Sequence, residues 1–163
     1  MTITNNIWAQ HRPGKQHIIW HVLIHVHQLL MFDDTWLALN LSSEVAAGWL
    51  ASHIEYALTH QHYTVPKGHK LPSHLSHLDT PSILIWQGQH DDTTAHHANY
   101  ELHTEHLHGP LRGGLWWASI TYQSHTVWNS DNHPDLRLKN IYSAQWIAEL
   151  ILMNHIISSS SSS

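Results

Sequence analysis

Histidine is the residue type in this chain whose side chains could perform the widest range of chemistry. Of 163 residues, 20 are His, against 7 Lys plus Arg and no Cys. Neutral imidazoles bind Zn²⁺ or Ni²⁺, and the ordinary pKa of histidine, about 6.5, lies within the physiological range. The formal charge is −5 with every histidine neutral. The absence of Cys excludes disulfides, thiolate metal sites and cysteine nucleophiles.

Two groups of histidines have spacings that suit a metal ion. In a helix, residues four apart share one face, so His17, His21 and His25 would form a stripe. In a strand, His106 and His108 would point to the same side, close to His103. Such pairs also arise by chance in a chain with so many histidines, and no His-Glu-x-x-His sequence is present. We therefore favour incidental pairing and expect no cofactor.

Motifs for other enzyme chemistry are weaker. The chain has no Gly-x-Ser-x-Gly sequence. The pairs Asp33-Asp34 and Asp91-Asp92 fall in predicted turns, where carboxylates are usually solvated. The stretch from Gly109 to Gly114 lacks the Lys-Ser/Thr of a phosphate-binding loop, and is typical of a hairpin turn. We expect a protein that is not an enzyme, with a histidine-ligated metal enzyme as a remote alternative.

The length and the hydrophobic pattern predict one α+β domain, in which an antiparallel sheet of about four strands packs against two or three helices. Residues 1–15 are expected to form an irregular arm, residues 16–157 the domain, and residues 158–163 a disordered tail of serines. We predict no signal peptide, no transmembrane segment, and a location in a virion or in the host cytoplasm. The acidic balance argues against recognition of nucleic acid sequence, and we expect no membrane partner.

The elements of the predicted domain follow from the spacing of apolar residues. Residues 16–31 fit either a helix or a strand, and their length favours the helix. Further helices are expected from Ser42 or Ser43 to about Gln61, and from Asn140 to about Asn154. Strands are expected at 35–41, 82–87, 99–108 and 115–128, and residues 91–95 are expected to form a polar connection.

Tryptophan supplies candidate contact residues. Trp116 and Trp117 are adjacent, so their indoles lie on opposite faces of one predicted strand. The expected C-terminal helix, which contains Tyr142 and Trp146, is apolar around most of its circumference. Helices on both faces of the sheet and an interface between subunits explain these features equally well. In the second case the interface contains Trp116, Trp117, Tyr142 and Trp146.

The order of the predicted elements carries a resemblance to a known family. A helix is followed by Pro81-Ser-Ile-Leu-Ile-Trp-Gln-Gly88, by strands at 100–108 and 115–128, and by a helix at 141–152. Over about residues 43–153 this order resembles the small α+β tail-terminator and neck proteins of tailed bacteriophages. The resemblance implies a structural subunit that forms a homo-oligomeric ring and contacts other structural proteins of the same particle.

Low charge, abundant Trp and the lack of a catalytic motif fit a second class equally well. A small binding or inhibitor protein, such as the immunity partner of a toxin, would show the same composition. The two classes differ in their expected assembly, because the first forms a closed ring and the second acts as a monomer or dimer.

Overall fold

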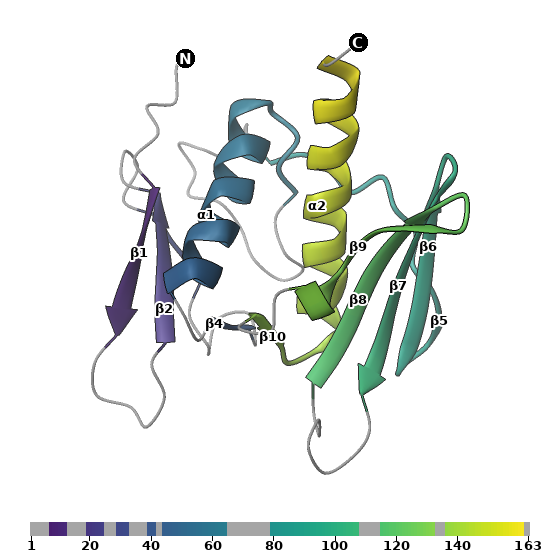
Figure 1. The fold of residues 1–163 in the computed structure, drawn as a ribbon, viewed down its shortest axis with the longest axis horizontal. Helices are drawn as coiled ribbons and strands as arrows, with labels where there is room; N and C mark the ends of the chain where they lie inside the picture. Colours follow the sequence, from purple (N-terminus) through teal and green to yellow (C-terminus); the bar gives the residue numbers. More distant parts are fainter. Residues whose placement is uncertain are drawn as a thin grey trace.

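The structure is a computed structural model that describes residues 7–12, 19–24, 29–32, 39–41, 44–64, 79–107, 115–132 and 136–161. The chain begins with three strands that form a small antiparallel sheet, and continues with a short strand and a helix. Their bounds are β1 Ile7–Arg12, β2 Ile19–Ile24, β3 Leu29–Phe32, β4 Leu39–Leu41 and α1 Glu44–Thr59. A larger antiparallel sheet follows, and a long helix comes last (Figure 1).

The larger sheet confirms the predicted α+β class. Five strands form a continuous antiparallel meander, and the short strands β10 and β4 extend it beyond β8. β9 and β10 share one edge of β8, where β9 pairs along residues 119–122 and β10 pairs at Trp116. The bounds are β5 Gln87–Gln89, β6 Asp92–His97, β7 Tyr100–Leu107, β8 Leu115–Tyr122, β9 His125–Asn129 and β10 Leu136–Leu138.

The second helix, α2 Ile141–Ser161, is the centre of the core. One side of α2 packs on β7 and β8, and another side packs on α1 (Figure 1). Its apolar side chains are buried around the helix, including Trp146, Ile147, Leu150 and Leu152. Within the described residues, α1 and the larger sheet cover most of this helix, whereas Tyr142 near its start is 43% exposed.

The start of α2 agrees with the predicted position because Asn140 caps it. The Asn140 side-chain oxygen accepts a hydrogen bond from the Ser143 backbone N–H at 2.8 Å, and the Ser143 hydroxyl lies 3.4 Å from the Asn140 N–H. This reciprocal arrangement satisfies N–H groups that a helix start leaves without partners. The far end differs from expectation, since the helix continues to Ser161 through residues predicted to be disordered. No Gly or Pro interrupts this stretch.

A row of polar groups lies between α2 and the buried face of the sheet. The Gln145 side-chain amide donates to the Thr93 hydroxyl at 3.0 Å, and the hydroxyls of Thr93 and Thr104 are 2.6 Å apart. One turn further on, Glu149 is also buried, and its carboxylate is hydrogen-bonded to the Ser82 side chain. Burial raises the pKa of Glu149, and the bond to Ser82 acts in the opposite direction.

The N-terminal sheet corrects two predictions. β1 lies inside the stretch expected to be an irregular arm, and β2 and β3 replace the helix favoured for residues 16–31. β1 and β2 pair along their whole length, from Ile7 opposite Ile24 to Arg12 opposite Ile19. Because this pairing partner satisfies the backbone, the β-branched residues of the segment adopt the strand that they intrinsically favour. This small sheet packs against α1 on the side away from α2 (Figure 1).

The first half of the chain and its connection to the larger sheet bear out some predicted boundaries and shift others. The helix expected up to Gln61 is α1. Of the strand expected at 35–41, the C-terminal end is β4. Residues 35–38 and the expected cap at Ser42 or Ser43 lie outside the described residues. The strand predicted at 82–87 begins only at Gln87. Before Gln87, the Ser82 hydroxyl accepts a hydrogen bond from the Leu84 N–H at 3.2 Å. The backbone there has a local hydrogen-bond partner in place of a neighbouring strand.

Within the larger sheet, the strand expected at 99–108 is present as β7. The predicted connection at 91–95 is instead part of β6, whose alternating Thr93 and Ala95 point into the core. The predicted long strand at 115–128 is a hairpin. Gln123 and Ser124 form its turn with φ of 50° and 70°, so β8 ends and β9 begins there.

Replacing the buried Glu149 by Gln is expected to stabilise the protein at neutral pH. A carboxyl group with a raised pKa binds its proton more tightly in the folded state, so stability falls as pH rises from its unfolded pKa, about 4.3, through the folded value. Glu149→Gln removes this loss and keeps the side-chain shape. Thermal melts should show a higher Tm than wild type at pH 7.5 and no difference near pH 4.

The exposed Glu101→Gln variant is the control, and its melting temperature should stay close to wild type at both pH values. A Glu149→Gln variant that melts below wild type at pH 7.5 would contradict the assignment of a destabilising buried carboxylate.

Candidate functional site

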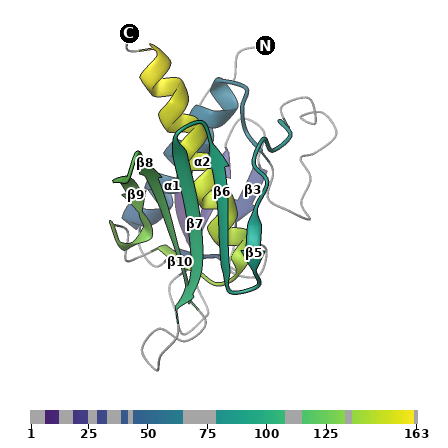
Figure 2. The same cartoon turned by 90° about the vertical axis from the view of Figure 1, so that its right-hand side faces the viewer.

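One face of the larger sheet, called the main sheet from here on, packs against the helices. No described element covers its other face. Figure 2 looks onto the uncovered face, with both helices behind the strands. Side chains alternate between the faces, so Leu102, Thr104 and Ile120 are buried against the helices. Their neighbours Glu101 and Glu105 are exposed. This uncovered face is the candidate functional surface.

A connected row of four side chains crosses the uncovered face, and we call it the outer strip: Asp92, His103, Trp117 and Asp131. The His103 Nε2 atom lies 2.7 Å from the Asp92 carboxylate, and its side chain is 29% exposed. The His103 ring stands nearly perpendicular to the Trp117 ring, with centroids 5.8 Å apart. The Trp117 indole N–H donates to Asp131 at 3.3 Å. The strip therefore holds a partly exposed indole in a defined orientation.

The outer strip contains an Asp–His pair, Asp92 and His103. A carboxylate beside a histidine orients the imidazole, but catalysis of acyl transfer also requires a nucleophile within hydrogen-bond reach of that ring. Ser119 lies opposite His103 in the strand register and is buried. Among the described residues, no hydrogen bond joins its hydroxyl to His103.

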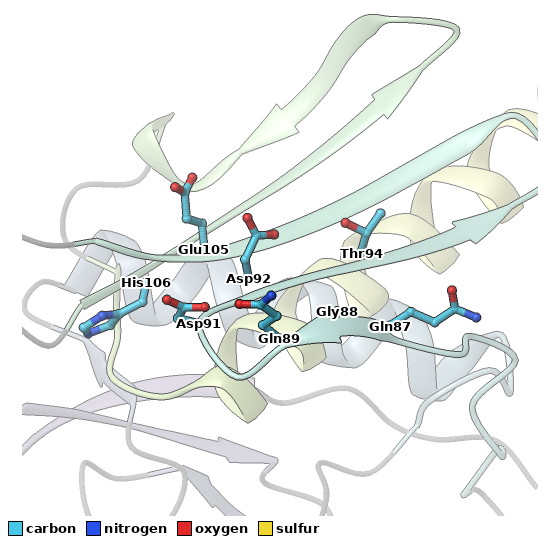
Figure 3. A pocket seen from close by; sticks show the side chains of 8 residues that line it. All are labelled: Gln87, Gly88, Gln89, Asp91, Asp92, Thr94, Glu105 and His106. Carbon is cyan, nitrogen blue, oxygen red and sulfur yellow. The ribbon is translucent and has the colours of Figure 1, made fainter.

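An acid-lined pocket of about 510 Å³ adjoins one end of the outer strip, at the β5–β6 hairpin. Asp92 and Glu105 are opposite each other in the register of β6 and β7, and their carboxylates point to the same side of the sheet (Figure 3). Gly88, with φ of 131°, shapes the hairpin, since a Cβ atom there would lie 2.3 Å from the Asp92 carbonyl oxygen. The pocket is lined by Gln87, Gly88, Gln89, Asp91, Asp92, Thr94, Glu105 and His106.

The predicted metal ligands do not come together in the part of the chain that the structure describes. His21 lies in β2 opposite Gln10, and therefore in a strand and not in the helix that the predicted stripe requires. His103 and His106 lie on opposite faces of β7, and His106 packs beside Trp116 with ring centroids 5.2 Å apart. His17, His25 and His108 lie outside the described residues. Within the described ranges, no group of three His, Asp or Glu side chains is placed to hold a metal ion.

The predicted interface residues have three different environments. Trp117 belongs to the outer strip, whereas Trp116 faces the helices and packs against the core. Tyr142, at the start of α2, is 43% exposed. Trp146 is a core residue, and its indole N–H donates to the Thr64 carbonyl oxygen at 2.9 Å. Asp92 and Asp131, which orient the outer strip, were not singled out as site residues, because aspartates near turns carry no specific signal.

No family model, no curated protein and no solved structure matches the chain. Within the described residues, no helix is long and apolar enough to cross a membrane.

Removal of metal is expected to leave the fold unchanged. The core consists of buried Leu, Ile, Ala and aromatic side chains, whose burial supplies the main driving force for folding. Thermal melting after treatment with EDTA should therefore give the same Tm as the untreated protein. A fall of about 10 °C, equivalent to several kcal/mol for a domain of this size, would reveal a structural metal site.

Proposed function

We propose that the protein is a non-enzymatic structural subunit of a phage-like particle, and that it acts by forming a closed homo-oligomeric ring like a tail terminator or neck protein. The order of its elements supports this proposal. A helix, an antiparallel meander and a second helix follow one another from α1 to α2, as the resemblance to tail-terminator and neck proteins implies.

The observation that carries the proposal is the uncovered sheet face with the oriented Trp117 indole. Trp is enriched at the energetic centres of protein interfaces because it combines a large apolar area with one hydrogen-bond donor. Polar side chains surround Trp117 in the outer strip, and such a polar border is typical of an interface formed after folding.

A second exposed apolar patch lies outside the sheet, in the segment that leads into its edge strand. Ile83 and Ile85, which precede the outermost strand β5, are 51% and 76% exposed. Two different patches on one subunit suit a head-to-tail contact, in which the outer strip of one copy meets the Ile83–Ile85 patch of the next. Repeated contacts of this kind close into a ring when the rotation between neighbours permits it.

One feature favours a small inhibitor or immunity-type protein as the second candidate. Strands β6 to β9 contain Asp and Glu but no Lys or Arg. Asp92, Glu101 and Glu105 are exposed on the uncovered face. A face with this charge is complementary to a basic partner protein, and electrostatic attraction of this kind speeds association.

The ring proposal predicts a defined assembly that depends on Trp117. Light scattering at micromolar concentration and pH 7.5 should give a mass several times the 18.8 kDa of one chain. Trp117→Ala should cost about 2 kcal/mol or more per contact and lower the measured mass at the same concentration. Val45→Ala is the control, because Val45 is 81% exposed on α1 and lies outside both patches.

A wild-type mass equal to one chain would contradict the ring. In that case the acidic face becomes the leading candidate surface, and binding to a basic protein should weaken as salt concentration rises. An assembly that Trp117→Ala leaves intact would show that the outer strip is not the contact.

A further inference from the structure

We propose that the junction between α1 and α2 is a pH-sensitive clamp, which holds the two helices together while its histidines are neutral and loosens when they are protonated. The clamp consists of Asn154 on α2, His53 on α1 and His62 just after α1. Asn154 is 6% exposed and His62 is 7% exposed. The inference does not depend on the proposed ring, because none of the three residues belongs to the outer strip or to the Ile83–Ile85 patch.

The hydrogen bonds of the Asn154 side chain determine the positions of its two amide atoms. Its amide nitrogen donates to the His53 carbonyl oxygen at 2.9 Å, and a carbonyl oxygen can only accept. The amide oxygen therefore faces His62 Nε2, at 2.7 Å, and accepts a hydrogen bond from it. One side chain of α2 thus binds α1 at His53 and the segment after α1 at His62.

The same hydrogen bonds require an unprotonated nitrogen on His53. The Asn154 amide nitrogen lies 3.1 Å from His53 Nδ1, and an amide nitrogen only donates, so Nδ1 is the acceptor. A proton on Nδ1 would place two donors opposite each other and break this bond. Protonation of His53 at Nδ1 and closure of the clamp therefore oppose each other.

His62 also fits the clamp in its neutral form. Its Nε2 atom carries the hydrogen that is donated to Asn154. Its Nδ1 atom is buried and has no hydrogen-bond partner in the part of the chain that the structure describes. A proton on Nδ1 would create a buried, charged N–H group without an acceptor there, and burial of such a group is costly.

The side chains around the clamp include few charged groups. Those that titrate and face it are Tyr56 and His60 from α1 and His155 from α2. β9 adds Val127 and Trp128, which do not titrate. The segment beside His62 adds Asp79, whose charge acts together with burial to raise the pKa of the neighbouring Tyr63. The N-terminal sheet lies on the side of α1 away from α2 (Figure 1).

The direction of the pH dependence follows from the hydrogen bonds of the clamp. The ordinary pKa of histidine is about 6.5. Since the folded state binds the neutral forms, the unfolded chain takes up these protons more readily. The stability that the clamp contributes is therefore fully present above about pH 6.5 and is lost as the pH falls below that value. Protonation of the buried Glu149 acts in the opposite direction, so only a comparison of variants isolates the clamp.

Two conservative substitutions remove the titration and keep the hydrogen bonds. In His53→Asn, the amide oxygen can take the position of Nδ1 and accept from Asn154, and in His62→Gln the amide nitrogen can take the position of Nε2 and donate to it. Thermal melts at pH 7.5 and pH 5.5 test the double variant. Its change in Tm on acidification should be less unfavourable than that of wild type by about 3 °C or more.

Each protein is compared with itself at two pH values, so a pH-independent loss of stability in a variant does not affect the result. His60→Gln is the matched control. The His60 Nδ1 atom lies 2.9 Å from the Tyr56 carbonyl oxygen and donates to it, so this bond is kept when the ring is protonated. The control should therefore lose at least as much Tm on acidification as wild type.

Hydrogen exchange, measured by mass spectrometry and corrected for the intrinsic pH dependence of amide exchange, locates the change. Peptides from residues 50–62 of wild type should lose protection at pH 5.5 relative to peptides from β7, and those of the double variant should not. The same change of Tm with pH in wild type and the double variant would overturn the clamp. Equal loss of protection in β7 and in residues 50–62 would overturn its location.

Discussion

Burial of α2 is the constraint from which the rest of the structure follows. A helix with apolar side chains around most of its circumference needs cover on several sides. The main sheet covers one side and α1 covers another. The few polar side chains of α2 then require partners in the interior, because an unsatisfied buried polar group costs about 1–3 kcal/mol. Thr93 binds Gln145, Ser82 binds Glu149, and two histidines bind Asn154.

This arrangement determines which face of the sheet is left open. Because α2 occupies the inner face of the sheet, the outer face is left for the strip that contains Trp117. On the other side of the sheet, a cleft lies where α1, α2 and β9 meet. The histidines contribute to both places as hydrogen-bonding groups. His103 holds the outer strip to Asp92, and His53 and His62 connect two segments of the chain through Asn154.

The sequence predicts those elements whose pattern is decided locally. α1, β7 and the start of α2 have clear periodicity or a capping residue, and the structure places them close to the predicted ranges. The N-terminal strands were missed because their stability comes from a distant pairing partner, which periodicity does not reveal. The β8–β9 turn was missed because Gln123-Ser124 is not one of the Asn-Gly or Asp-Gly pairs that usually signal a two-residue hairpin.

The candidate site was partly predictable for the same reason. Trp117 was identified because adjacent indoles must point to opposite faces of a strand. Asp131 accepts the Trp117 N–H, and Asp92 binds His103, which packs against Trp117. These aspartates lie 14 and 25 residues from Trp117 along the chain, and only the folded register brings them to the same face. The hydrogen bonds of Asn154 span still larger separations along the chain, 101 residues to His53 and 92 residues to His62. No sequence spacing indicates contacts of that kind.

Oxidative footprinting with hydroxyl radicals, read by mass spectrometry at several protein concentrations, tests most directly whether the uncovered face is an assembly surface. If subunits assemble through this face, Trp117 is protected at high concentration and becomes reactive on dilution. Tyr122, which is 37% exposed on the other face of the same strand, should react equally at every concentration. Equal reactivity of Trp117 at all concentrations would contradict assembly through this face.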